Sequence, residues 1–448
     1  MNKKSLIISL IVLFTILVLM AFSLKPDNVM PDNTPPIVNI SEVGDNYGSE
    51  IEKLGEIKLK RRAKLKKVLR ANSKRFIVRY EYDLQGDTIF VGDNCLLDFR
   101  GGCFKNGVIV GQSTKIRFQE TPIFSNIIIS GSWNVPYLSS KLFKDIENDN
   151  VLDQLFNLTD SLIQNKVIIE DGTYNVSVSK HNEGALLPKS NTEIVLKGRI
   201  SLIPNPFSAY QIISIMGVKD LYLHGDGVIV GDMYTHEYQE NSSNEWGHGL
   251  VIRGSENVII DGITIKDCTG DCCSIGAIAS YDVNKPVPVG TPSFKVELRN
   301  CTFEGSRRQG LTIGFATEVI VDNCEFSGIY RTFKGTEPGA GIDIEPDNVG
   351  VKKIERGCDV ADITIKNSSF RRLRLGILAW KTEDANDTRN YKGLRIENCT
   401  FDDILRNNVF LAGFKDAVVK SCVSRNIRWG IGFSNCINAY EVDCKTVN

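Results

Sequence analysis

Two acidic side chains occupy alternate positions of one short apolar segment, Gly341-Ile-Asp-Ile-Glu345. Successive side chains of a β-strand point to opposite faces, so Asp343 and Glu345 would share one face and the isoleucines the other. Adjacent carboxylates repel each other, which makes such a pair unusual unless it performs acid–base chemistry or binds a cation. This segment is therefore the first candidate for a reactive site.

Other residues able to do chemistry come directly before similar short segments. They are Glu245-Trp246-Gly247-His248, Gly270-Asp271 and Arg307-Arg308-Gln309. Each residue alone would be an ordinary solvated turn residue, but several on consecutive repeats indicate one groove. Chain length supports this, because 17 positions separate Cys324 from Gly341 where regular repeats have 8 or 9. Long loops on a rigid scaffold commonly build functional sites.

The elements that must position these residues recur along the second half of the chain. A β-branched run is followed by Asn or Asp, then Cys or Ser, and often by Phe two residues later, with a base period of 22 or 23. Short alternating strands at such a period predict a β-solenoid, in which each coil buries its apolar face against its neighbours. The pattern occurs at Asp267-Cys268, Asn300-Cys301-Thr302-Phe303, Asn323-Cys324-Glu325-Phe326, Asn367-Ser368-Ser369-Phe370, Asn398-Cys399-Thr400-Phe401, Ser421-Cys422 and Asp443-Cys444.

A second strand follows each of these turns and commonly begins at glycine. Stacked in register, these strands would form one long parallel sheet with apolar residues alternating inward. The strands are 249–253, 272–276, 310–314, 341–345, 376–380, 408–412 and 430–434. Two outward columns result, one with Val251, Ser274, Thr312, Asp343 and Leu378, the other with Arg253, Gly276, Gly314, Glu345 and Trp380.

These repeats resemble right-handed parallel β-helix proteins of the pectin-lyase-like superfamily, which includes polygalacturonases, pectate lyases and phage tailspikes. The resemblance covers roughly residues 160–448. It implies an all-β, right-handed parallel β-helix whose Asn-Cys turns form asparagine ladders. Gly247-His248-Gly249, Gly270-Asp271-Cys272 and Asp343 are similar to elements of polygalacturonase-type hydrolases, although Gly-His-Gly precedes the aspartate here. The set is also similar to uncharacterised β-helix repeat proteins of Bacteroidetes.

The first function that these residues suggest is an inverting glycoside hydrolase acting on an acidic polysaccharide. One carboxylic acid would protonate the leaving oxygen and the other would activate water, with Asp271, Asp343 and Glu345 as candidates. Asp271 and Asp343 lie two coils apart, or roughly 9.6 Å. His248 would position Asp271. The expected substrate-binding residues are Glu245, Trp246, Arg307, Arg308, Gln309 and Trp380.

Two other functions stay open. In a uronate-specific lyase, Arg307 or Arg308 would neutralise the uronate, and Ca²⁺ on Asp343, Glu345 and Asp347 would acidify the α-proton. The same acidic residues would equally suit a structural Ca²⁺ site. In a non-catalytic glycan-binding or surface-structural β-helix, tryptophans would stack on sugars. The fold alone does not separate these functions.

The composition limits the class of protein. The 448 residues are 42% hydrophobic and 24% charged, which is ordinary for a globular chain. A net charge of −1 gives no general case for nucleic-acid binding. The 12 cysteines are too few for a disulfide scaffold. We expect mostly reduced, buried thiols, with Cys95–Cys103 the best disulfide candidate.

The N-terminus carries an export signal. Lys3 and Lys4 precede an apolar run that ends near Ala21-Phe22-Ser23, a pattern typical of a cleaved signal peptide. The run is also nearly long enough for an uncleaved membrane anchor. We therefore expect a secreted, periplasmic or cell-surface protein with a polysaccharide partner, and a homotrimer is possible for such a fold. The expected regions are 1–23 signal or anchor, 24–75 linker with a basic stretch, 76–137 β-rich cap or early coils, 138–165 helical connector and 166–448 β-helix.

Overall fold

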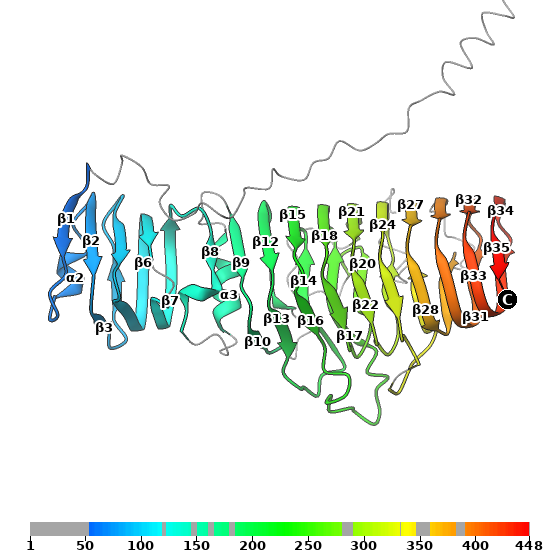
Figure 1. Cartoon of the computed structure of the whole chain (residues 1–448), viewed down its shortest axis with the longest axis horizontal. Helices are drawn as coiled ribbons and strands as arrows, with labels where there is room; N and C mark the ends of the chain where they lie inside the picture. Colours follow the sequence, from blue (N-terminus) through cyan, green and yellow to red (C-terminus); the bar gives the residue numbers. More distant parts are fainter. Residues whose placement is uncertain are drawn as a thin grey trace, which may run out of the picture. The chain divides into compact units, whose positions relative to one another are not determined.

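The computed structural model describes residues 53–447 except 119–121, 145–149, 160–164, 179–183, 280–289, 332, 346–358 and 382–389. Its folded unit, Leu54–Asn448, consists of parallel strands stacked coil upon coil in sequence order (Figure 1). Among the described residues, no helix is long and apolar enough to cross a membrane. The predicted signal or anchor, 1–23, lies outside the described residues.

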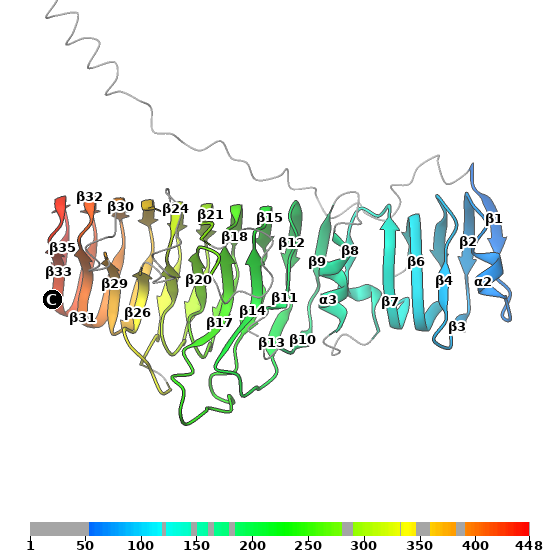
Figure 2. The same ribbon diagram turned by 180° about the vertical axis from the view of Figure 1, so that it is seen from behind.

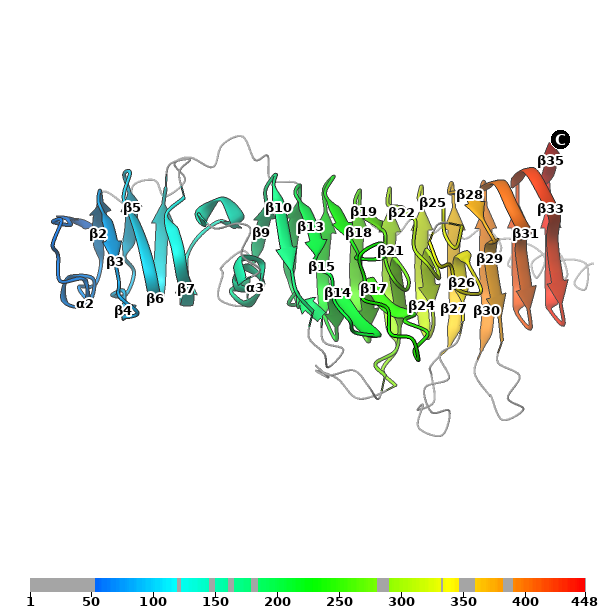
Figure 3. The same cartoon turned by 90° about the horizontal axis from the view of Figure 1, so that it is seen from below.

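Each complete coil contributes three strands. The first belongs to an 11-stranded sheet, visible as one layer in Figures 2 and 3. Its strands are β8 (Leu138–Ser139), β9 (Lys166–Ile169), β12 (Thr192–Leu196), β15 (Lys219–His224), β18 (Glu256–Asp261), β21 (Ser293–Arg299), β24 (Ala316–Asp322), β27 (Val360–Lys366), β30 (Tyr391–Glu397), β32 (Lys415–Lys420) and β34 (Ile437–Val442).

The other two strands of each coil form two rows within a 17-stranded sheet. The first row holds β10 (Thr173–Val176), β13 (Arg199–Leu202), β16 (Val228–Val230), β19 (Thr264–Lys266), β22 (Thr302–Glu304), β25 (Glu325–Ser327), β28 (Ser369–Leu373) and β35 (Lys445–Val447). The second row holds β11 (Gly184–Leu186), β14 (Ala209–Met216), β17 (Trp246–Arg253), β20 (Cys273–Gly276), β23 (Leu311–Ile313), β26 (Ala340–Ile344) and β29 (Leu375–Trp380). The long strands β31 (Thr400–Ala412) and β33 (Val423–Ser434) run through both rows.

The Asn-Cys turns have the geometry that the repeat predicted. Asn300 and Asn323 lie in the left-handed region, at φ 52° and 53°, which asparagine tolerates better than most residues. The Asn323 side-chain amide donates to Asn300 Oδ1 at 2.7 Å, so neighbouring coils are joined by an asparagine ladder. The following Cys301 and Cys324 are buried and fill the corner of the core.

The cysteines are thiols. All eleven that the structure describes are free, so the disulfide expected between Cys95 and Cys103 is wrong. The two residues serve different sheets, because Cys95 directly precedes β5 (Leu96–Phe99), whereas Cys103 begins β6 (Cys103–Arg117) and pairs with Glu81. Cys95 Sγ donates to the Ala71 carbonyl at 3.1 Å instead.

The region before residue 166 differs from the expected linker and connector. Strand β1 (Gly55–Lys58) and helix α2 (Leu65–Val68) lie within the predicted linker, and Leu59, Leu65 and Leu69 are buried. In the described part of 138–165, the helices are η3 (Ser140–Leu142) and α3 (Asn150–Asn157). The strands between α2 and η3 pair in parallel, as early coils would. They are β2 (Lys74–Val78), β3 (Glu81–Asp83), β4 (Thr88–Phe90), β5, β6 and β7 (Phe124–Trp133).

Inside the second half of the solenoid, the repeated Phe forms a continuous stack. Phe303, Phe326, Phe370 and Phe401 lie with ring centroids 4.9 Å apart and nearly parallel planes. Each ring fills the space between the rings of the neighbouring coils. The core of one coil is therefore completed only by the next.

We expect Phe326→Ala to lower the free energy of unfolding by about 3–5 kcal/mol, because it removes one ring from a fully buried stack. Urea unfolding followed by circular dichroism measures the loss. Phe90→Ala is the control, since the Phe90 side chain is 51% exposed and should change stability little. Equal losses for the two variants would contradict this account of the core.

Candidate functional site

The predicted acidic strand lies on the outer face of the second row. Strand pairing aligns Ser274 with Thr312 and Thr312 with Asp343, which confirms the outward column expected from the sequence. The intervening Ile342 and Ile344 enter the core. Asp343 nevertheless has an exposed fraction of 0%, so this outward position is covered.

Arg308 joins two of the candidate carboxylates. Its Nη2 donates to Glu345 Oε2 at 2.8 Å, and its Nη1 lies 3.3 Å from Asp271 Oδ2. Thr312 Oγ1 also donates to Asp271 Oδ2, at 2.8 Å. The structure thus brings together two acids, from the coils on either side of Arg308, around one guanidinium.

His248 contacts the same group from the preceding coil. The backbone N–H of Asp271 donates to His248 Nδ1 at 3.1 Å. A neutral imidazole whose Nδ1 accepts a hydrogen bond carries its proton on Nε2. His248 therefore fixes the backbone that carries Asp271. A role in positioning Asp271 is what the sequence predicted for His248.

Asp343 is a buried acid with one free oxygen. Its Oδ2 accepts from Gln309 Nε2 at 2.7 Å, whereas its buried Oδ1 has no hydrogen-bond partner in the described part of the chain. Burial raises the pKa of Asp343 well above its ordinary value of 3.8, and the negative charge of Glu345 raises it further. Arg308 offsets only part of this rise. Asp343 therefore holds its proton to a higher pH than an ordinary aspartate does.

Asp271 is buried as deeply, but neighbouring groups offset more of the cost of burying its negative charge. Burial raises the pKa of this carboxyl too, while the charge of Arg308 and the hydrogen bond from Thr312 act in the opposite direction. Two carboxyl groups in one site thus differ in how strongly they hold a proton. Such a difference is how proteins separate an acid from a base.

The other expected site residues divide into two groups. The Trp246 side chain is 44% exposed, and the guanidinium of Arg308 lies 5.7 Å from its ring centre, so it belongs to the surface of the site. We call Asp271, Asp343 and Glu345 the acidic cluster. Glu245 and Trp380 are half-buried, and among the described residues no hydrogen bond or ion pair joins either of them to the acidic cluster. Asp347 lies outside the described residues.

Arg307 does not face the acidic cluster, contrary to its expected role in holding a substrate anion. Its guanidinium donates to the backbone carbonyls of Asn244 (2.6 Å), Thr269 (3.1 Å) and Lys334 (2.9 Å). It also lies over the Tyr238 ring at 4.9 Å. Arg307 thus fastens the loops between the two rows through these hydrogen bonds, and substrate binding by Arg307 stays a prediction.

Calcium ligation by Asp343 and Glu345 is not favoured by the side chains around them. Glu345 is paired with Arg308, and a guanidinium occupies the place where a cation would balance its charge. Among the described residues, no group of three or more His, Cys, Asp or Glu could hold a metal ion.

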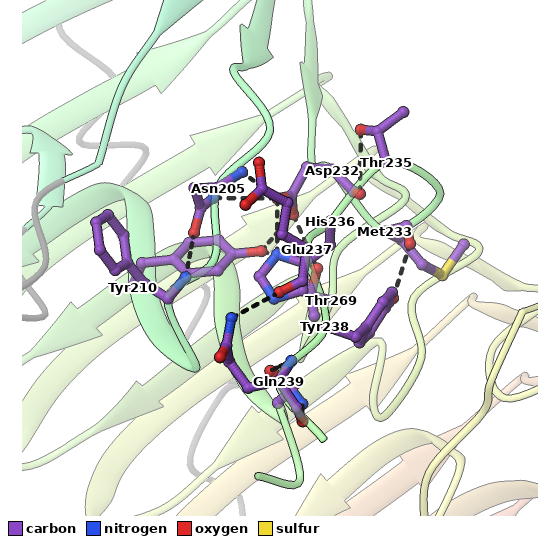
Figure 4. Close-up of polar contacts among 12 residues, drawn as sticks. Asn205, Tyr210, Asp232, Met233, Thr235, His236, Glu237, Tyr238, Gln239 and Thr269 are labelled. Carbon is purple, nitrogen blue, oxygen red and sulfur yellow. Dashed lines mark hydrogen bonds and ion pairs between the residues drawn. The ribbon is translucent and has the colours of Figure 1, made fainter. Parts of the chain in front are cut away.

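A second polar cluster, around Asp232, was not predicted from the sequence (Figure 4). His236 Nδ1 lies 2.8 Å from Asp232 Oδ2, and Asn205 Nδ2 donates to the same oxygen at 3.0 Å. The Tyr210 hydroxyl donates to Asp232 Oδ1, and Thr269 Oγ1 donates to it at 2.9 Å. The His236 side chain is fully buried, and its Nε2 has no partner in the described part of the chain.

The Asp232 cluster supports the acidic cluster directly. Thr269 belongs to it, and Asp271 follows two residues later on the same turn. The Tyr210 ring packs against Gly247, where an added Cβ would come within 2.4 Å of that ring. Gly247 is thus required next to His248, and the two clusters share one set of turns.

One sequence signal could have located the Asp232 cluster. The segment between β16 and β17, from Gly231 to Glu245, is 15 residues long, whereas only six separate β19 from β20. The segment before Gly341 is long in the same way, with 17 positions from Cys324 to Gly341. The contacts of Asp232 with Asn205 and Tyr210, however, depend on how the coils stack.

Comparison with known proteins fits the observed architecture. Residues 289–448 match the family model described as right handed beta helix region. This chain is a right-handed parallel β-helix protein. A double mutant of the tailspike protein of E. coli bacteriophage HK620, in complex with a pentasaccharide, has a TM-score of 0.53 at 12% identity, over 69% of this chain and 57% of that one. At that identity the likeness is one of fold.

Two curated proteins of Bacillus subtilis (strain 168) are similar in sequence to this β-helix. The SPbeta prophage-derived uncharacterized protein YorA is 29% identical over 214 residues, which are 46% of this chain and 35% of YorA. The uncharacterized protein YclG is 32% identical over 196 residues, 42% of this chain and 32% of YclG. The chain spans about a third of the length of these relatives.

We expect Asp343→Asn to stabilise the β-helix at pH 8 but not at pH 4. Below its ordinary pKa of 3.8, Asp343 is protonated in both the folded and unfolded states. As the pH rises toward its raised folded pKa, only the unfolded state releases the proton, and stability is lost. Asparagine has no such loss, so the variant should gain about 1 kcal/mol or more in urea unfolding at pH 8. Asp416→Asn, at an exposed site, should show no such pH trend.

Removal of the Tyr210 hydroxyl tests the Asp232 cluster. Tyr210→Phe should lower the free energy of unfolding by about 1.5–3 kcal/mol, because a buried carboxylate loses a donor. Tyr222→Phe is the matched control, as its half-buried hydroxyl makes one long hydrogen bond of 3.4 Å to Asp261. Similar urea midpoints for the two variants would show that the cluster adds little stability.

Proposed function

We propose that this β-helix binds a polysaccharide over the outer face of its second row and cleaves glycosidic bonds by acid–base catalysis. The observation that carries the proposal is the pair Asp343 and Asp271, two buried carboxyl groups of one site whose surroundings raise their pKa values to different extents. Glycoside hydrolysis needs such a pair, one to protonate the leaving oxygen and one to activate water. Asp343 is the proposed proton donor and Asp271 the proposed base.

The environment of each carboxyl suits its proposed role. Burial beside Glu345 raises the pKa of Asp343, so this carboxyl keeps its proton to a higher pH than an ordinary aspartate does. Asp271 is held by Arg308 and Thr312, which favour its charged form. After Asp343 gives up its proton, the nearby guanidinium of Arg308 would stabilise the new carboxylate.

The exposed members of the site support a carbohydrate ligand. Trp246 offers an apolar ring at the surface, and Glu345, whose side chain is 30% exposed, offers hydrogen-bond acceptors beside it. A sugar ring combines an apolar face with hydroxyl groups and fits such a surface. The bound pentasaccharide of the similar tailspike is consistent with this ligand class. An acidic sugar would compete with Glu345 for Arg308.

Three further features stay part of the proposal. Export of the chain rests on the apolar segment after Lys3 and Lys4. A hydrolase is preferred to a calcium-dependent lyase, because Glu345 is already paired with Arg308. Homotrimeric assembly is a prediction from the resemblance alone.

A glycan-binding protein without catalysis is the second candidate. It is favoured by the burial of Asp343 and Asp271, at 0% and 1% exposure, whereas Trp246 is exposed. In that case sugars would contact Trp246 and Glu345 and never reach the buried acids. The two candidates therefore differ in whether the acids meet substrate.

Product analysis on a panel of acidic and neutral polysaccharides tests the proposal. We expect new reducing ends without the ultraviolet absorbance of an unsaturated uronate. Asp343→Asn should lower the rate at least 100-fold, because it removes the proton donor. The control Asp416→Asn, on an exposed position of the 11-stranded sheet, should keep the full rate.

Three outcomes would contradict the hydrolase. Ultraviolet absorbance that requires Ca²⁺ would identify a lyase. Unchanged turnover by Asp343→Asn would exclude its proposed role. Retention of a glycan without any product, lost in Trp246→Ala but kept in Asp343→Asn, would identify a binding protein.

A further inference from the structure

The first coil of the folded unit carries a strong concentration of positive charge. Residues 54–79 contain 11 Lys and Arg but only one acid, Glu56, whereas the rest of the chain has 42 basic and 53 acidic residues. The near-neutral total therefore conceals a marked segregation of charge. Neither the acidic cluster nor the Asp232 cluster uses any of these residues.

This coil is a folded element and not a loose basic tail. Leu59, Leu65 and Leu69 are buried and fix α2 and the segments beside it to the core of the early coils. The basic residues alternate with these leucines and stay outside. Six of them, which we call the basic patch, are all exposed: Lys60, Arg61, Arg62, Lys64, Lys67 and Arg70.

The charges of the basic patch are not balanced within the protein. Two nearby lysines form ion pairs: Lys58 Nζ lies 3.5 Å from Glu56 Oε1, and Lys66 Nζ lies 2.6 Å from Asp87 Oδ1. No member of the basic patch has an acidic partner among the described residues. Six clustered cations repel one another and weaken the fold slightly, so the buried leucines hold this coil together against its own charge.

The basic patch also lies at an end of the stacked coils. Strand β1 pairs with β2 alone and is the terminal strand of its sheet. Figures 1 and 2 show α2 beside β1 at this first coil. No further described coil covers this end, so the six side chains are available to a charged surface.

We propose that this end of the β-helix docks on anionic phospholipid headgroups of a membrane. The predicted signal or anchor ends near Leu24, and only 29 residues separate it from Leu54. An uncleaved anchor would hold the first coil near the bilayer, and a cleaved one would release it there. A cluster of this size attracts acidic headgroups, with about fivefold in affinity for each Lys or Arg near the surface.

Vesicle partitioning of the full chain tests this. Vesicles of phosphatidylglycerol and phosphatidylcholine in equal parts are compared with phosphatidylcholine alone, because the apolar segment would insert into both. We expect at least 100-fold tighter partitioning to the anionic vesicles. High salt should remove the difference, since at about 1 M the Debye length falls to about 3 Å.

Two matched variants locate the effect. Changing Lys60, Arg61, Arg62 and Lys64 to Gln should lower the preference for anionic vesicles at least 100-fold. The control changes Lys392, Arg395, Lys415 and Lys420 to Gln, four exposed residues on β30 and β32, and should keep the preference. Far-ultraviolet circular dichroism checks that both variants stay folded. Polysaccharide turnover should be unchanged in both, so this proposal can fail independently of the proposed function.

Two results would overturn the membrane proposal. Equal partitioning to both kinds of vesicle, or equal losses in the two variants, would show that the basic patch does not recognise headgroups. Retention on immobilised polygalacturonate that the basic-patch variant loses, without any vesicle preference, would assign the patch to an acidic polysaccharide.

Discussion

Successive coils of this β-helix are hydrogen-bonded residue by residue, and the register of that pairing determines where every side chain lies. Asparagines in the left-handed conformation fix the turn after four strands of the 11-stranded sheet, at Asn300, Asn323, Asn367 and Asn398, and their amides join one coil to the next. The phenylalanine stack inside the turn permits only one phase. A slip of one residue would send Asp343 into the core and Ile342 to the outer face.

Given that register, the electrostatics of the site follow from burial. Arg308 contacts Asp271 and Glu345, whereas Asp343, on the same segment as Glu345, accepts a hydrogen bond from Gln309. Burial raises the pKa of Asp271, and the charges of Arg308 and of the buried Arg253 oppose that rise. Burial and the charge of Glu345 raise the pKa of Asp343 well above its ordinary value, and Arg308 offsets only part of that rise. The scaffold thus places two buried carboxyl groups of different proton affinity on one face of the sheet.

The turns that carry these acids are supported from behind. The Asp232 cluster fixes Thr269, two residues before Asp271, and Arg307 ties the same turn to two longer segments through backbone carbonyls. Adjacent arginines therefore have different tasks: Arg308 controls charge in the site, while Arg307 holds the loops in place. The basic first coil lies outside both networks, and its buried leucines and the pairing of β1 with β2 hold it to the next coil.

The sequence by itself determined the fold and the column of outward residues. Parallel stacked coils are the fold that the sequence pattern predicts, from its period of 22 or 23 residues, its Asn-Cys turns and the strict alternation around Asp343. It did not determine that Asp343 is buried, that Arg307 binds carbonyls, or that Cys95 and Cys103 serve different sheets. These depend on loops of irregular length, whose contacts join residues 20 to 60 positions apart and follow no period. The Asp232 cluster was missed for the same reason, since its partners lie on three different coils. Only the tertiary structure brings Asn205, Asp232 and Thr269 within hydrogen-bonding distance.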